Sequence, residues 1–226
     1  MTQNMFDLSG KTAVVTGGAG IIGTPVCHGL AAHGAQVAVA DIDGEAAEKL
    51  AGGIAKEHGV KTLGVQCDVS SPQAVSSMVE SVCAKLGGIH VLHNNAASKA
   101  GSLEEFMAPF EDFKLDIWRK VMSVNLDGMF LVAQAVGKKM IEQGEGGSII
   151  QTSSIYGVVG PHKKIYEISN ILGAQINAPA VYSASKAAVI GLTKYLSAYW
   201  ADKGIRVNTL VPGGVESGQD AAFKSA

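Results

Sequence analysis

Short runs of β-branched and small apolar residues alternate along the chain with longer segments in which apolar residues recur every three or four positions. The short runs predict buried strands of a parallel sheet, and the longer segments predict helices. The predicted strands lie at residues 12–16, 36–41, 62–68, 89–95, 146–154 and 205–211. The predicted helices lie between the first strand and about residue 33, and at residues 44–58, 72–86, 114–143 and 182–204. This alternation predicts an α/β fold, with a doubly wound parallel sheet covered by helices on both faces.

The composition is that of a compact domain rather than of a membrane or nucleic-acid-binding protein. Of the 226 residues, 47% are hydrophobic and 28 are glycine, and the net charge is −2. This charge offers no basic surface for nucleic acid. Residues 12–40 contain no charged side chain, but glycines, Pro25 and two histidines interrupt them. We interpret this segment as strands and a buried helix, not as a membrane span.

The cysteines and the first residues predict a cytoplasmic protein. Cys27, Cys67 and Cys83 are odd in number and lie far apart, which is typical of a reducing compartment. The opening residues, MTQNMFDLSGK, lack the apolar core of a secretory signal. No repeat or linker divides the sequence, so we expect residues 1–226 to form a single domain.

A glycine-rich segment, TGGAGIIG, connects the first predicted strand to the first helix. Glycines allow a sharp turn and a close approach of backbone N–H groups to a pyrophosphate, and the following helix presents its positive dipole end. Strand, turn and helix in this order predict a nucleotide site of the Rossmann type. Asp41 ends the second strand, where a carboxylate can accept both hydroxyls of an adenosine ribose and repels a 2′-phosphate. No Arg or Lys lies in the loop or beside Asp41 in the sequence, so NAD is predicted over NADP.

Other acidic residues leave alternatives open at this edge of the sheet. Asp41 could merely begin a turn, and Asp43 offers a second carboxylate nearby. Asp68 closes the third strand, where it could cap its own loop or reach an adenine amine. Because ligands of doubly wound sheets bind beyond the carboxyl ends of the strands, we expect all the candidate site residues to gather there.

Two tyrosines compete for the role of an acid–base group, because the sequence IYEISN nearly repeats the sequence VYSASK. Tyr182 and Lys186 are four residues apart on a predicted helix and share a face, where the ammonium lowers the pKa of the phenol from its usual value of about 10. Ser154 ends the fifth strand, so its hydroxyl can hold a substrate oxygen in the same crevice. Tyr166 has uncharged Asn170 at the same spacing, so we predict that Tyr182 is the acid–base residue.

Taken together, these motifs resemble those of the short-chain dehydrogenase/reductase (SDR) family, single-domain branch, from near residue 8 to near residue 217. The matching segments are TGGAGIIG, the Asp41 position, CDV (67–69), NNAA (94–97), VNLDG (124–128), SSIYG (153–157), YSASK (182–186) and IRVNTLVPGG (205–214). The resemblance implies a short-chain NAD(P)-dependent dehydrogenase/reductase acting on CH–OH groups. Residues 1–226 would form one Rossmann-type NAD-binding catalytic domain, with the C-terminal lid and the last strand missing.

The resemblance also implies roles for individual residues. Tyr182 would be the general acid–base, and Lys186 would be its pKa partner and a ribose ligand. Ser154, rather than Ser153, would orient the carbonyl or alcohol, and Asn125 would hold a water that links Lys186 to solvent. By residue chemistry alone, Asn125 is only a polar residue in a helix. The implied cofactor contacts are Gly17, Gly20, Ile22, Gly23, Asp41, Asp68, Val69, Asn95, Ala96, Tyr182, Lys186, Pro212, Gly213 and Val215.

The sequence departs from the pattern of this branch at several points. Ile21 replaces the middle glycine of the loop, whose spacing matches the extended branch that includes sugar-nucleotide epimerases and dehydratases. NNAA replaces the common NNAG. Ser154 and Tyr182 are also farther apart than usual, and we interpret residues 161–179 as an insertion at the mouth of the active site that shapes substrate choice.

Metal ions, membranes and nucleic acid are not expected as partners. His90 and His93 are three apart on a predicted strand and therefore point to opposite faces, and no other group of Cys, His and acidic residues has metal-ligand spacing. The helices at 114–143 and 182–204 pair between subunits in the family, so the resemblance implies a homodimer or homotetramer.

Three functional hypotheses follow. The leading one is an NAD(H)-dependent oxidoreductase that interconverts a secondary alcohol and a ketone on a sugar or sugar-derived substrate, with 3-oxoacyl or gluconate-type substrates as alternatives. The second is a sugar-nucleotide epimerase or dehydratase with tightly bound NAD. The third is a non-catalytic NAD-binding protein.

Overall fold

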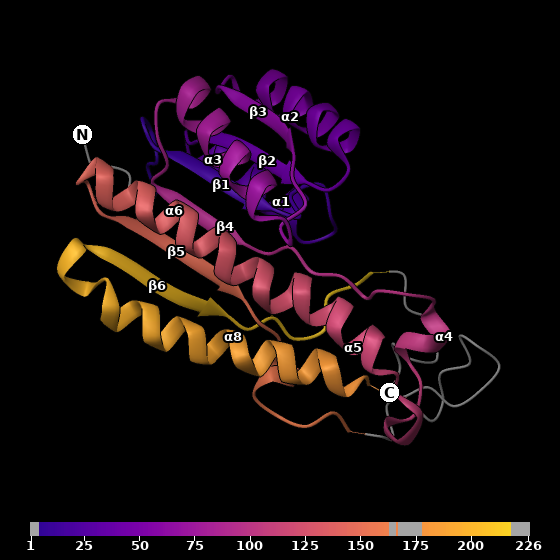
Figure 1. Ribbon diagram of the computed structural model, residues 1–226. Coiled ribbons are helices and arrows are strands. Elements are labelled where there is room, and N and C mark those ends of the chain that lie inside the picture. The colour runs from indigo at the N-terminus through magenta and orange to yellow at the C-terminus, as the bar shows by residue number, and fades with distance from the viewer. Residues whose placement is uncertain (1–4, 163–165, 167–177, 218–226) are drawn as a thin grey trace.

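The computed structural model describes residues 5–162, 166 and 178–217, which contain a six-stranded parallel sheet (Figure 1). The strands are β1 (Thr12–Thr16), β2 (Gln36–Asp41), β3 (Thr62–Gln66), β4 (Val91–Asn94), β5 (Gly147–Thr152) and β6 (Ile205–Leu210). Their order across the sheet is β3-β2-β1-β4-β5-β6. The direction of winding reverses between β1 and β4, which places the expected ligand crevice at the carboxyl ends of these strands. The predicted fold class is confirmed.

Helices cover both faces of the sheet (Figure 1). The α-helices are α1 (Gly23–Ala32), α2 (Gly44–His58), α3 (Pro72–Leu86), α4 (Leu103–Phe106), α5 (Leu115–Met122), α6 (Met129–Gln143) and α8 (Ala180–Tyr199). Three 3₁₀ turns, η1 (Phe110–Asp112), η3 (Ile155–Gly157) and η4 (Ala201–Lys203), and a π-helical segment, η2 (Ser123–Gly128), complete the described elements. Helices α1 and α2 lie on one face, and α3, α6 and α8 lie on the other.

Alternate residues of the central strands enter two separate cores. Val15 packs with Ile54 beneath α1 and α2, whereas its neighbour Val14 packs with Met78 and Met140 beneath the helices of the opposite face. Burial on both faces explains the continuous apolar runs in the sequence, because neither side of a central strand meets water. Both layers of helices are thereby held against the sheet, which fixes the loops at its carboxyl edge.

Several predicted elements have different ends in the structure. The single helix predicted at 114–143 is a chain of α5, η2 and α6, with a π-helical centre. The helix predicted at 182–204 begins at Ala180, directly after Pro179, and ends at Tyr199. The strands predicted at 62–68, 89–95, 146–154 and 205–211 are shorter, because their end residues belong to the flanking loops. Most of the expected insertion at 161–179 lies outside the described residues.

Candidate active site and cofactor site

The glycine loop joins β1 to α1 at the carboxyl edge of the sheet. Gly17 has a φ of +60°, in the left-handed region that favours glycine. A Cβ at Gly23 would collide with the carbonyl oxygen of Gly17, so α1 begins directly against the turn. Ile21 is 60% exposed and fills no space inside the loop, so the missing middle glycine leaves the turn intact. The loop is a bare backbone cradle of the kind that admits a pyrophosphate.

The hydroxyl of Thr16 ties this loop to the end of β4. It donates to Oδ1 of Asn94 at 3.1 Å and accepts the backbone N–H groups of Asn95 at 2.9 Å and Ala96 at 3.1 Å. The side-chain amide of Asn95 donates to the carbonyl oxygens of Thr16 at 3.2 Å and Gly17 at 3.4 Å. Asn95 and Ala96 therefore hold the start of the glycine loop against the end of β4.

Asp41 lies at the end of β2, next to the glycine loop. Its Oδ2 accepts the backbone N–H of Ala19 at 3.0 Å, and its Oδ1 accepts that of Asp43 at 3.2 Å. The carboxylate of Asp43 instead caps α2, because it accepts the N–H of Ala46 at 3.0 Å. Of the two carboxylates that the sequence left open, Asp41 is the one bonded to the loop.

Asp68 and Val69 follow β3 and have mainly internal contacts. Oδ1 of Asp68 accepts the backbone N–H of Ser70 at 2.9 Å and its hydroxyl at 2.7 Å, so the carboxylate caps its own turn. Val69 is 6% exposed, and its side chain occupies the space that a Cβ at Gly128 would need. These contacts hold the loop after β3 against η2.

The predicted contacts near the nicotinamide end lie beyond β6. The carbonyl oxygen of Pro212 accepts the N–H of Ile155 at 3.0 Å, so this segment runs beside the residues that follow β5. Gly213 and Val215 are exposed beyond that bond. Residues 212–214 thus lie at the same edge of the sheet as Ser154.

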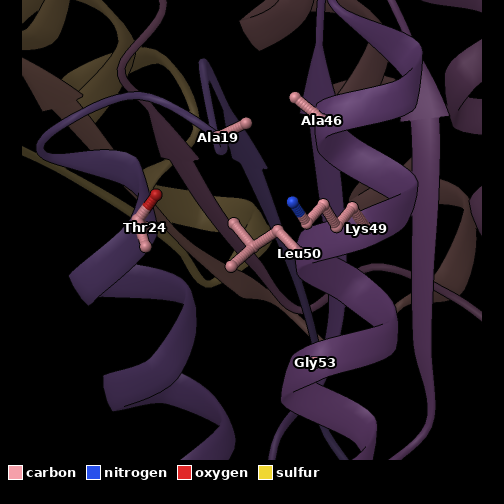
Figure 2. A pocket seen from close by; sticks show the side chains of 6 residues that line it. All are labelled: Ala19, Thr24, Ala46, Lys49, Leu50 and Gly53. Carbon is pink, nitrogen blue, oxygen red and sulfur yellow. The ribbon is translucent and has the colours of Figure 1, made fainter.

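A hollow of about 340 Å³ opens between the glycine loop, α1 and α2 (Figure 2). Its lining residues are Ala19, Thr24, Ala46, Lys49, Leu50 and Gly53. Ala19 is also the residue whose N–H binds Asp41. Lys49 brings an amine to this hollow from the second turn of α2, although no Lys or Arg is close to Asp41 in the sequence.

Tyr182 and Lys186 lie one turn apart near the start of α8. Nζ of Lys186 is 5.8 Å from the centre of the Tyr182 ring and donates to the carbonyl oxygen of Thr152 at 2.9 Å. Lys186 is 2% exposed, and this burial lowers the pKa of its amine to about 8. The amine is thus held by β5 beside the Tyr182 ring.

The two serines that follow β5 have different partners. The hydroxyl of Ser153 donates to the carbonyl oxygen of Lys186 at 2.7 Å, which ties β5 to α8. Oγ of Ser154 accepts the N–H of Tyr156 at 3.3 Å, so its proton can be donated to a ligand. The role of Ser154 as the residue that orients substrate stays a prediction, and these bonds favour it over Ser153.

Asn125 lies in η2, between α5 and α6. Its Oδ1 accepts the backbone N–H of Ser98 at 2.8 Å. Its Nδ2 is buried and has no hydrogen-bond partner among the described residues. Because an unpaired buried amide is costly, this group is suited to bind a water or a ligand. π-Helical turns within α-helices are frequently found at functional sites.

Tyr166, the competing tyrosine, is buried against another phenol. Its hydroxyl donates to that of Tyr156 at 2.8 Å. Burial, with help from this hydrogen bond, raises the pKa of Tyr166 well above its usual value. A phenol held protonated in this way is poorly suited to proton exchange at neutral pH.

Three contributors to the site were not predicted as site residues. Thr16 is the first residue of the TGGAGIIG segment, and Thr152 holds the Lys186 amine through a backbone carbonyl that any residue could supply. Ser98 likewise acts through its backbone N–H. Only Thr16 carries a side-chain signal, as a small hydroxyl residue directly before the glycines.

Among the helices that the structure describes, none combines the length and apolarity needed to cross a bilayer. The chain matches the family model described as "short chain dehydrogenase" over residues 11–225. It is 35% identical over 207 residues to D-threitol dehydrogenase from Mycolicibacterium smegmatis, covering 92% of this chain and 71% of that protein.

Two solved structures are also similar to this chain over most of its length. NAD⁺-bound xylitol dehydrogenase has a TM-score of 0.81 and 34% identity, with 93% of this chain and 73% of that chain covered. Gluconate 5-dehydrogenase from Burkholderia cenocepacia, in complex with NADP and tartrate, has a TM-score of 0.82 and 34% identity, with 96% and 79% covered. These matches cover nearly the whole sequence, and the structure places a glycine loop beside Asp41 and the buried Lys186 beside Tyr182. The chain therefore belongs to the short-chain dehydrogenase/reductase family of oxidoreductases.

Proposed function

We propose that the chain is an NAD(H)-dependent dehydrogenase that interconverts a secondary alcohol and a ketone on a small polyol or other sugar-derived substrate. The observation that carries the proposal is the Lys186 amine, which is buried one helical turn from Tyr182 and held by the carbonyl oxygen of Thr152. This arrangement suits acid–base chemistry, because it places a positive charge beside a phenol at the carboxyl edge of the sheet.

The cofactor cradle fits a dinucleotide. The glycine loop leaves no room for a side chain at Gly23. The first turn of α1 begins there, and the N–H groups at a helix N-terminus can bind a phosphate. Asp41 lies beside this loop, where its carboxylate would accept the ribose hydroxyls. When bound, the nicotinamide supplies a carbon that accepts or donates hydride.

The residues of the chain would handle the proton. Ser154 donates a hydrogen bond to the substrate oxygen and fixes its position. Tyr182, as phenolate, takes the hydroxyl proton during oxidation and returns it during reduction. Lys186 places its positive charge beside the Tyr182 ring, and the unpaired amide of Asn125 holds a water through which the proton reaches solvent.

The choice of NAD rests on Asp41. The related structures carry either nucleotide, since xylitol dehydrogenase is bound to NAD⁺ and gluconate 5-dehydrogenase to NADP. A carboxylate at the end of β2 repels a 2′-phosphate, which favours NAD. Lys49 opposes this preference only in part, because Asp41 is bonded directly to the loop while Lys49 lines the hollow beside it.

The proposed substrate class follows the named relatives, which act on threitol, xylitol and gluconate according to their names. A screen of polyols, sugar acids, nucleotide sugars and acyl ketones with NAD(H) and NADP(H), followed by nicotinamide absorbance, tests it. We expect turnover with NAD on a polyol or sugar-derived alcohol, abolished by Tyr182→Phe. Turnover of a nucleotide sugar on retained NAD, with no net absorbance change, would instead identify an epimerase.

We also propose that the enzyme is a cytoplasmic homo-oligomer that pairs through α5, α6 and α8. Tyr195 and Tyr199 on α8 are each 62% exposed and stack with ring centres 5.5 Å apart. Exposed aromatic side chains on a helix are typical of subunit contacts. Light scattering should give a dimer or tetramer, and a Tyr195→Glu/Tyr199→Glu variant should shift the protein toward monomer.

A further inference from the structure

A cluster of three side chains with metal-binding atoms lies where α1 packs against the end of α2. His28 comes from α1, and Glu57 and His58 form the end of α2. Nδ1 of His28 lies 3.2 Å from Nε2 of His58 and 3.2 Å from Oε2 of Glu57, and Nε2 of His58 lies 3.5 Å from Oε1 of Glu57. Packing of the helices thus brings together residues about thirty positions apart.

These separations are those of ligands around one small cation. Zinc binds histidine nitrogen at about 2.0–2.1 Å and carboxylate oxygen at about 2.0–2.2 Å in a tetrahedron, which places the ligand atoms roughly 3.3–3.5 Å apart. The two ring nitrogens are 3.2 Å apart, and they lie 3.2 and 3.5 Å from different oxygens of the Glu57 carboxylate, so the separations are at or just below this range. A cation at the centre would therefore reach all three groups with little movement of the side chains.

Hydrogen bonding alone satisfies the cluster poorly. Nδ1 of His28 carries at most one proton, yet it faces both Nε2 of His58 and a carboxylate oxygen of Glu57 at the same distance. If both rings donated to Glu57, their two N–H groups would face each other at 3.2 Å, and if one ring nitrogen were unprotonated, only one bond to the carboxylate would remain. A metal ion uses the lone pairs of both ring nitrogens and of the carboxylate at once.

Burial and charge also suit a divalent ion. The side chains of His28 and His58 are 32% and 17% exposed, whereas that of Glu57 is 61% exposed, so the cluster is half-buried and open to solvent on the side of the carboxylate. Two neutral imidazoles and one carboxylate reduce a charge of +2 to +1. Imidazole and carboxylate together favour zinc among the common cations, and water completes such three-ligand sites.

We propose that His28, Glu57 and His58 form a zinc site, with water as the fourth ligand, that fastens α1 to the end of α2. Asp43, which caps the start of α2, lies beside Asp41 and the cofactor loop, whereas the cluster lies at the other end of that helix. The site is thus separate from Ser154, Tyr182 and Lys186, and it acts on stability. Its function is to hold together two helices whose N-termini flank the cofactor cradle.

Metal binding to the chelator-treated full chain tests this proposal. Titration calorimetry with zinc should give one equivalent, and cobalt as a substitute should give the intense visible absorption of a tetrahedral site. The His28→Gln/His58→Gln variant should lose both signals, with affinity lowered by more than the roughly 10–100-fold that second-shell changes cause. His33→Gln, in which an exposed histidine just after α1 is replaced, is the matched control and should bind like the parent.

Thermal unfolding gives a second measurement that does not depend on activity. Zinc at 100 times its Kd should raise the Tm of the parent protein by roughly 5–10 °C, and it should leave the Tm of the double variant unchanged. Circular dichroism checks that the variant is folded. The proposal is wrong if the parent binds no equivalent of zinc or cobalt, or if the folded double variant binds either metal as the parent does.

Discussion

Nζ of Lys186 donates a 2.9 Å hydrogen bond to the carbonyl oxygen of Thr152, so that β5 holds the amine that faces the ring of Tyr182. The strand and the helix are further joined by the hydroxyl of Ser153, which binds the carbonyl oxygen of the same lysine at 2.7 Å. Lys186 is therefore fixed at both its backbone and its amine. A charge with so little freedom acts on the neighbouring phenol without first having to be ordered.

Tyr182→Phe should abolish turnover and leave cofactor binding almost unchanged. Removal of the phenol eliminates proton exchange, which contributes about 10²–10⁴-fold to rates, whereas the glycine loop is untouched. Steady-state rates and a fluorescence titration with NADH measure the two effects. Tyr166→Phe is the matched control and should retain most of the activity, because the hydroxyl that it removes donates to the hydroxyl of Tyr156. The reverse result would assign the chemistry to Tyr166.

Ser154→Ala and Ser153→Ala should separate catalysis from folding. Loss of the Ser154 hydroxyl should lower kcat by about 10²–10³-fold with little change in stability, since it removes a donor to the reacting oxygen. Loss of the Ser153 hydroxyl should destabilise the protein by about 0.5–1.5 kcal/mol, because it removes the hydrogen bond that ties β5 to α8. Kinetics and urea denaturation of both variants check this, and equal kinetic losses would refute the division of roles.

Lys186→Met should inactivate the enzyme and stabilise it at neutral pH. The pKa of the buried amine is lowered from 10.5 to about 8, so its charged form costs about 3 kcal/mol below pH 8. Loss of the hydrogen bond to Thr152 offsets about 1 kcal/mol of the gain. We expect a net gain of roughly 1–2 kcal/mol at pH 7, measured by denaturant unfolding.

The pH dependence of this gain follows from proton binding by the two states. Between pH 8 and pH 10.5 the unfolded chain keeps the Lys186 proton while the folded chain releases it, so the stability of the parent rises with pH there relative to the variant. The advantage of Lys186→Met should therefore shrink across this window. An advantage that grows with pH would contradict the buried-charge explanation.

Asp41→Ser should shift cofactor preference toward NADP. The change removes the carboxylate that repels a 2′-phosphate, and Lys49 in the neighbouring hollow can then attract it. We expect the ratio of kcat/KM for NAD over NADP to fall by roughly 100-fold, or about 2.7 kcal/mol. Lys49→Ala added to Asp41→Ser should remove part of the gain with NADP. An unchanged ratio in the single variant would show that Asp41 does not select the cofactor.

The sequence was sufficient to predict the order of the elements, because the central strands are buried on both faces and therefore stand out as apolar runs. Element ends were less predictable, since they depend on local contacts: α8 starts at Ala180 because Pro179 precedes it, and α4 depends on the capping of its first turn by Ser102. The π-helical centre of the long helix has no period that distinguishes it from an α-helix.

Within the candidate site, the sequence indicated side chains that belong to local motifs, such as Tyr182 and Lys186, which the structure brings close together, and their catalytic roles stay predictions. Thr152 and Ser98 contribute backbone groups, which leave no mark on residue type. The group of His28, Glu57 and His58 was missed for another reason, since ligand spacing in the sequence cannot show which turns of two helices pack together.

The wider turns of η2 make the length of this segment as important as its composition. Each residue of an α-helix advances the chain by about 100° around the axis. The wide turns of η2 advance less per residue and so accommodate one extra residue, and deletion of one residue from 123–128 would restore a regular helix with α5 and α6 close to their present orientation. Val132 and Met140 would then stay in the core, whereas Asn125 would leave its place beside Ser98. The chain should therefore still fold when this segment is shortened by one residue, but it should lose what Asn125 contributes to the site.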